Sequence, residues 1–78
     1  MQLSGALSFA NAHAVWEVFA PSAAGVSTID VSGVTDVDSA GLALISALRR
    51  KSGPACRVIG LTPKLATLAS AYDVEALF

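Results

Sequence analysis

The fold is decided by residues 29–42, which read Ile29-Asp30-Val31-Ser32-Gly33-Val34-Thr35-Asp36-Val37-Asp38-Ser39-Ala40-Gly41-Leu42. This stretch begins inside a β-branched run, residues 26–31, which is typical of a buried strand parallel to a neighbour. Residues 32–38 are expected to form a loop. The chain from Ser39 or Ala40 to Lys51 is dense in Leu, Ile and Ala, which predicts a helix. The stretch therefore predicts a strand, a turn and the start of a helix.

Before this stretch, the sequence predicts one more strand and one more helix. Residues 3–9 alternate in polarity and predict a half-buried strand, whose inward side chains are Leu3, Leu7 and Phe9. Asn11 is a suitable N-cap for a helix that runs to about Ala20. The apolar stripe of that helix is predicted to consist of Ala14, Val15, Val18 and Phe19.

After this stretch, a third strand and a third helix are predicted. Residues 56–61 form the strand, and Thr62-Pro63 is a cap followed by proline at the first position of a helix that runs to about Ala71. Residues 74–78 are too few to assign. Strands that alternate with helices predict a single α/β domain over residues 1–78, with a small mixed sheet flanked by helices and right-handed crossovers.

The composition excludes several classes of function. The chain has 78 residues, of which 54% are hydrophobic, and a formal net charge of −1. The only basic run, residues 49–51, has no interleaved aromatic residues and suits the end of a helix, so no nucleic-acid partner is expected. No apolar run approaches the ~20 residues that cross a bilayer, so no membrane insertion is expected. Cys56 is the only cysteine, which excludes an internal disulfide and favours a reducing cytoplasm.

Ser39 is the residue of this stretch whose position suggests a function. It is predicted at or beside the helix N-cap, close to unpaired backbone N–H groups and the positive end of the helix. A phosphate on its hydroxyl would be stabilised by those groups and repelled by Asp36 and Asp38. In the purely structural alternative, Ser39 only caps the helix, Asp38 complements the dipole and Gly41 permits close packing.

The sequence lacks the parts of an enzyme. No nucleophile has an available base and no paired carboxylates adjoin a cleft, so no catalytic residue is predicted. Asp30, Asp36 and Asp38 cluster around the loop, but no further ligand-rich motif accompanies them, and neither a metal ion nor a cofactor is expected. His13, the only histidine, is expected at the surface, while Trp16 suits a partner contact and the core equally well.

The quoted stretch resembles the signature loop of STAS domains, in the segments Asp30-Val31-Ser32-Gly33-Val34 and Val37-Asp38-Ser39-Ala40-Gly41-Leu42. The resemblance extends over nearly the whole chain, including Gly5-Ala6-Leu7 and Pro63-Lys64-Leu65. The family includes bacterial anti-sigma factor antagonists and the small STAS subunits of ABC transporters. This resemblance implies an α/β STAS fold that works by binding a partner protein.

Two branches of this family remain open. In the antagonists, the residue that matches Ser39 is phosphorylated by a partner kinase that is also the anti-sigma factor. Those proteins typically carry an acid shortly after the first-strand glycine, whereas this chain has Gly5-Ala6-Leu7-Ser8. Its central stretch, including Gly41-Leu42-Ala43-Leu44, is more similar to the STAS subunit of Mla-type phospholipid ABC transporters, which binds the ATPase subunit in the cytoplasm.

Both branches imply the same contact region. The predicted partner-binding residues are Asp36, Asp38, Ser39, Ala40, Gly41 and Leu42, and Ser39 is also the candidate phosphorylation site. The favoured partner is an ABC transporter ATPase subunit, and the alternative partner is an anti-sigma factor kinase. The favoured branch implies a cytoplasmic protein that reaches the inner membrane only as part of the transporter complex.

Overall fold

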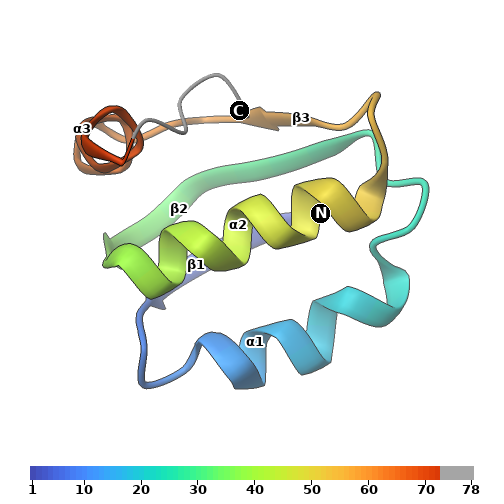
Figure 1. Cartoon of the computed structure of the whole chain (residues 1–78), viewed down its shortest axis with the longest axis horizontal. Helices are drawn as coiled ribbons and strands as arrows, with labels where there is room; N and C mark the ends of the chain where they lie inside the picture. Colours follow the sequence, from blue (N-terminus) through green and yellow to red (C-terminus); the bar gives the residue numbers. More distant parts are fainter. Residues whose placement is uncertain (73–78) are drawn as a thin grey trace.

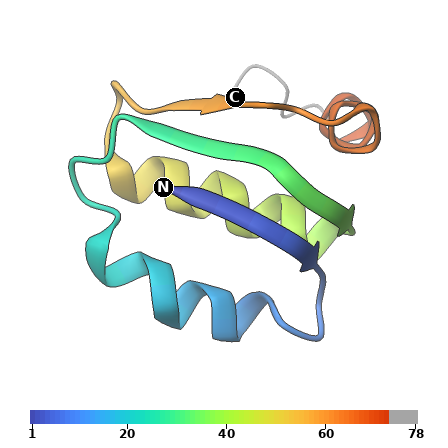
Figure 2. The same cartoon turned by 180° about the vertical axis from the view of Figure 1, so that it is seen from behind.

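The computed structural model describes residues 1–72 and forms a three-stranded sheet with helices packed against it (Figure 1). Helices α1 and α2 lie on the same face of the sheet, and α3 lies beside it where β3 ends (Figure 2). The elements in chain order are β1 (Gln2–Leu7), α1 (Ala12–Phe19), the short 3-10 helix η1 (Ala20–Ser22), β2 (Thr28–Val37), α2 (Ser39–Ser52), β3 (Arg57–Ile59) and α3 (Pro63–Ala71).

All three strands of the described chain run parallel, in the order β1-β2-β3. The predicted α/β class with a small sheet flanked by helices is confirmed, but the expected mixture of strand directions is not found among these residues. The reason is that each connection between neighbouring strands contains a helix, and a strand–helix–strand crossover returns the chain in the same direction.

Strand β2 continues through residues 32–37, where the sequence predicted a loop. Its pairing with β1 shifts register twice. Gln2 and Ser4 of β1 pair with Asp30 and Gly33 of β2, and the second shift lies between Gly5 and Ala6. Each shift gives β2 an extra residue, as in a β-bulge. The buried positions of β2 are therefore spaced by two and then by three, at Ile29, Val31, Val34 and Val37. This broken period is why the end of the strand was predicted as a loop.

The core lies between the sheet and its helices. Its fully buried large side chains come from β1, β2, α2 and α3: Leu3, Leu7, Ile29, Val31, Ile45, Leu48 and Leu65. Burying one such side chain contributes about 1.5–3 kcal/mol. Helix α2 supplies two of them from successive turns, so it is the main cover of the sheet.

The first strand ends earlier than predicted, at Leu7, and Phe9 is 86% exposed. Asn11 occupies the N-cap position of α1 without capping it. Its Nδ2 instead donates to the Ala6 carbonyl over 2.6 Å, while its Oδ1 accepts from the Ser8 backbone N–H over 2.8 Å. The Asn11 side chain thus closes the turn between β1 and α1, and this turn leaves Phe9 outside the core.

Helix α1 presents a different face from the predicted one. Val18 is 70% exposed and Ala14 is also exposed, whereas Val15 and Phe19 are half-buried as expected. The side chains that pack against the core are Ala12, Val15, Trp16 and Phe19. Trp16 therefore belongs to the edge of the core, which answers the question left open by the sequence.

Helix α3 begins as predicted. The Thr62 hydroxyl accepts from the Leu65 N–H over 3.2 Å, and Pro63 occupies the first turn. The third strand is shorter than predicted, spanning only residues 57–59. The unassigned tail, residues 74–78, lies outside the described residues.

Helix α2 approaches the sheet closely at Gly41. This glycine is buried, and a Cβ added to it would collide with the Leu7 carbonyl oxygen and lie 2.8 Å from the carbonyl carbon. The obstacle is backbone, which cannot rotate away as a flexible side chain would. Gly41 is therefore required for the packing of α2 on β1.

We predict that Gly41→Ala lowers the free energy of unfolding by about 1–3 kcal/mol or more, as overpacking does. Without the collision, alanine would instead stabilise the helix by about 1 kcal/mol. The exposed residue Ala43 of the same helix provides the control, because Ala43→Val should change stability by no more than about 0.7 kcal/mol. Urea unfolding measures both variants, and an unchanged or higher midpoint for Gly41→Ala would contradict the prediction.

Candidate functional site

The candidate site lies at the carboxyl ends of the parallel strands. One residue separates β2 from α2, and three residues separate β3 from α3, so both helices start at the same edge of the sheet (Figure 1). The turn that follows β1 also lies at this edge. In open parallel sheets, the crevice outside the carboxyl ends of the strands is the usual place for binding.

The N-cap of α2 is Asp38. Its Oδ1 accepts from the Gly41 N–H over 3.0 Å, and its Oδ2 accepts from the Phe9 N–H over 3.0 Å. The Asp38 N–H in turn donates to the Leu7 carbonyl over 3.2 Å. Both hydrogen bonds to the carboxylate lower the pKa of Asp38, with the Phe9 bond as the larger cause. This one side chain therefore joins the turn after β1 to the start of α2.

Ser39 is the first residue of α2 and is exposed. Because Asp38 caps the helix, the hydroxyl of Ser39 is not needed as the cap. Ser39 instead lines a shallow hollow of about 210 Å³, together with Leu42, Ala43, Ser46 and Tyr72. The cap that the structural alternative assigned to Ser39 is therefore Asp38 instead, whereas the close packing that it assigned to Gly41 is confirmed.

The other predicted partner-binding residues differ in how much surface they offer. Asp36 is exposed and Ala40 is half-buried. Gly41 is buried against Leu7, and Leu42 is only 3% exposed. The structure thus brings all of these residues together at the start of α2, but Gly41 and Leu42 support the surface from below and contribute little to it.

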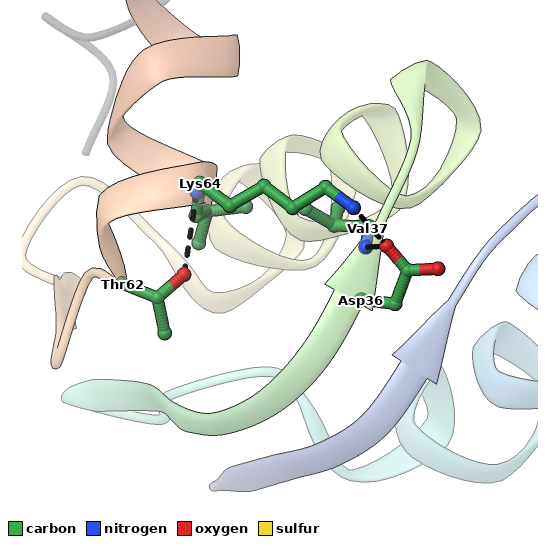
Figure 3. A network of polar contacts seen from close by, with 5 residues as sticks. Asp36, Val37, Thr62 and Lys64 are labelled. Atoms are coloured by element: carbon green, nitrogen blue, oxygen red, sulfur yellow. Dashed lines mark hydrogen bonds and ion pairs between the residues drawn. The ribbon is translucent and has the colours of Figure 1, made fainter.

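Asp36 is paired with Lys64, which extends from α3 across to the end of β2 (Figure 3). The Asp36 carboxylate also accepts from the Val37 N–H over 3.0 Å. The hydrogen bond from Lys64 is the main cause that lowers the pKa of Asp36, and the bond from Val37 adds to it. Both side chains of the pair are more than half exposed, so the pair contributes little to stability, but it neutralises a negative charge beside Ser39.

The three aspartates that cluster in and around the predicted loop each have a different role. Asp30 accepts from the Ser32 N–H over 2.9 Å, which lowers the pKa of Asp30, while Asp36 is paired with Lys64 and Asp38 caps α2. Within residues 1–72, no three His, Cys, Asp or Glu side chains are grouped so that they could hold a metal ion. No helix in this part of the chain is long and apolar enough to cross a membrane.

Sequence reasoning missed several residues of this surface. Ala43 and Ser46 follow Ser39 at helical spacings of four and seven, so helix periodicity could have placed them on the same face. Tyr72 is 56% exposed and reaches the hollow only through the packing of α3 beside α2, which no local signal indicates. Phe9 was predicted to be buried, and its exposure follows from the turn after β1.

Comparison with known proteins identifies the family. The family model described as MlaB, STAS domain, matches residues 1–78. The chain belongs to this STAS family. It is 34% identical over 79 residues to the intermembrane phospholipid transport system binding protein MlaB of Escherichia coli (strain K12), covering 97% of this chain and 81% of that protein. The protein of the same name in Shigella flexneri gives the same values. The family suggested by the signature stretch is thereby confirmed.

In this STAS domain, the pKa values of Asp36 and Asp38 should respond differently to salt. At about 1 M salt the Debye length falls to ~3 Å, so the ion pair with Lys64 is screened and the pKa of Asp36 should rise toward its ordinary value. The pKa of Asp38 should stay low, because backbone hydrogen bonds are its cause. Carboxyl ¹³C chemical shifts followed from about pH 2 to about pH 6 measure both values.

The same lowered pKa values determine how the stability of the fold changes with pH. Each carboxylate contributes stability that is present above the unfolded-state pKa of about 3.9 and is lost as the pH falls through the lower folded-state pKa. Acid should therefore destabilise the start of α2 through Asp38 at any salt concentration. If high salt raised the pKa of Asp38 as much as that of Asp36, the assignment of backbone hydrogen bonds as the cause would be wrong.

Proposed function

We propose that this chain is a non-enzymatic accessory subunit that binds and regulates the ATPase of an Mla-type phospholipid ABC transporter. The relatives named above are binding proteins of an intermembrane phospholipid transport system, and the match of the family model over residues 1–78 supports the same role for this chain. The chain would act in the cytoplasm and reach the inner membrane only within the transporter complex. We further propose that residues 1–78 work as one domain in this role.

The observation that carries the proposal is the exposed Ser39 at the start of α2. Asp38 satisfies the N–H of Gly41, so the hydroxyl of Ser39 is available to a partner. The hollow beside it is lined by residues of α2 and by Tyr72, the C-cap of α3, and its apolar members suit an apolar side chain from the partner. A small hydroxyl beside a shallow apolar hollow favours protein docking over catalysis, for which an enclosed cleft with a perturbed acid–base pair is expected.

Phe9 provides a second apolar contact at the same end of the molecule. Its backbone N–H is bound to Asp38, and its side chain is 86% exposed. An exposed aromatic ring next to a polar surface is a common anchor in protein interfaces. The proposed docking surface therefore consists of Phe9, Asp36, Asp38, Ser39, Ala40, Ala43 and Tyr72, with Gly41 and Leu42 beneath it.

We predict that Ser39→Glu weakens binding to the purified ATPase by about tenfold or more, because a buried, unpaired charge would enter the contact. Ser22→Glu is the matched control, since Ser22 is exposed on η1 and the added charge is the same. Titration calorimetry measures the affinity, and the rate of ATP hydrolysis with and without the chain measures regulation. Equal affinities of wild type and Ser39→Glu would contradict the docking surface, and no binding by wild type would contradict the function.

The same experiment addresses the alternative partner. If a kinase that is also an anti-sigma factor bound the chain and transferred phosphate to Ser39, the chain would be an antagonist and the transporter proposal would be wrong. Phosphorylation is read by the mass of the intact chain after incubation with ATP, and Ser39→Ala must abolish the mass increase for that assignment to hold.

The contribution of Phe9 can be tested separately. Phe9→Ser should weaken binding to the ATPase by about tenfold, as the loss of an aromatic anchor does, without lowering the thermal stability of the free chain. The control is Val18→Ser, which removes an apolar side chain that is 70% exposed on α1 and lies outside the proposed surface. Equal losses in the two variants would indicate a general effect of surface hydrophobicity instead of an anchor.

A further inference from the structure

A second hollow lies away from the docking surface, beside the C-terminal half of α2 and β3. Its volume is about 610 Å³, within the range of about 300–1,000 Å³ that is typical of small-molecule sites. It is lined by Arg49, Pro54, Ala55, Cys56, Arg57, Val58 and Ile59. Arg49 follows Ser39 by ten residues on α2, which corresponds to about 15 Å along the helix.

Arg49 has an unsatisfied donor in this region. Its Nε is buried, and within residues 1–72 it has no hydrogen-bond partner. A buried polar group without a partner costs about 1–3 kcal/mol, and more when it is charged, so native proteins rarely leave one unpaired. Arg49 is also one of the residues that line the hollow, so an anion held there would lie close to its guanidinium.

The charges around the hollow favour an anion. Of the five Lys and Arg residues in the chain, Arg49, Arg50, Lys51 and Arg57 are at this end, while Lys64 is paired with Asp36 at the other. None of the seven lining residues is acidic. Arg49 and Arg57 are thus both among the residues that line one hollow, and its described lining contains no carboxylate.

Dipole complementarity explains only part of this cluster. Cations in the last turn of a helix interact favourably with its negative end, and this accounts for the exposed Arg50 and Lys51. It does not account for the buried Nε of Arg49. It also does not account for Arg57, which lies on β3 and not on the helix.

We propose that this hollow binds the phosphate group of an organic phosphomonoester, with Arg49 and Arg57 as its ligands. Guanidinium groups bind phosphate through pairs of parallel hydrogen bonds, and two of them match the charge of about −1.5 to −2 on a phosphomonoester at neutral pH. The organic part of the ligand would lie against Pro54, Val58 and Ile59. Soluble sugar phosphates and the headgroup of phosphatidic acid share this chemistry.

The test titrates the folded chain with glycerol 3-phosphate, and separately with phosphatidylcholine vesicles that contain phosphatidic acid. The readout is the Nε–H resonance of Arg49 in ¹H–¹⁵N spectra, together with sedimentation for the vesicles. We expect saturable binding with a shifted Arg49 resonance. Arg49→Gln and Arg57→Gln should each weaken binding about tenfold or more, as expected when a hydrogen bond to a charged group is lost.

Arg50→Gln is the matched control, because it removes the same charge one residue away at a position that does not line the hollow. It should weaken binding by no more than about twofold. Circular dichroism melting must show that each variant is folded, and Arg49→Lys, which keeps the charge without the fork of donors, should also bind more weakly than wild type.

Each outcome decides the proposal. Saturable binding of glycerol 3-phosphate identifies a soluble ligand, and binding to vesicles alone, lost in Arg49→Gln but kept in Arg50→Gln, identifies a lipid headgroup. Absence of binding to both probes would overturn the proposal, as would equal losses in Arg49→Gln and Arg50→Gln, which indicate a diffuse counterion effect. None of these results depends on ATPase binding, which involves the other end of α2.

Discussion

The close contact between Gly41 and the backbone of Leu7 is the constraint on which the rest of this structure depends. It lets the first turn of α2 lie directly on β1, at a distance that a Cβ would not permit. The Asp38 carboxylate fixes the same turn from the other side, through the N–H groups of Gly41 and Phe9. One packing contact and two hydrogen bonds thus determine where α2 starts relative to two strands and a turn.

This arrangement also supports the docking that we propose for the surface at the start of α2. The hydrogen bonds of Asp38 and the packing of the buried Gly41 and Leu42 fix the start of the helix against β1 and the turn that follows it. Ser39 is left exposed because an aspartate one position earlier performs the capping. A preorganised surface of this kind loses little conformational entropy on binding, which favours affinity from a small contact area.

Acidic residues lie near the beginning of helix α2 and basic residues lie at its end. Its beginning adjoins Asp36 and Asp38, and its end carries the three consecutive cations of residues 49–51. The acidic residues at the beginning are satisfied within the chain, by Lys64 or by backbone N–H groups. At the end, the buried Nε of Arg49 has no such partner within residues 1–72. The two ends therefore differ in charge: the acidic groups at the beginning are neutralised or hydrogen-bonded, whereas the cations at the end have no ion-pair partner among residues 1–72.

The sequence by itself determined the order of strands and helices, the cap and first residue of α3, and the signature stretch that places the chain in its family. These features depend on contacts between near neighbours, such as a Thr62 hydroxyl and an N–H three residues on. Tertiary structure alone decided that β2 continues through two bulges, that Phe9 is exposed and that Tyr72 lies beside Ser39. The physical reason is that a bulge depends on the partner strand, and the exposure of a side chain depends on elements that pack against it from elsewhere in the chain.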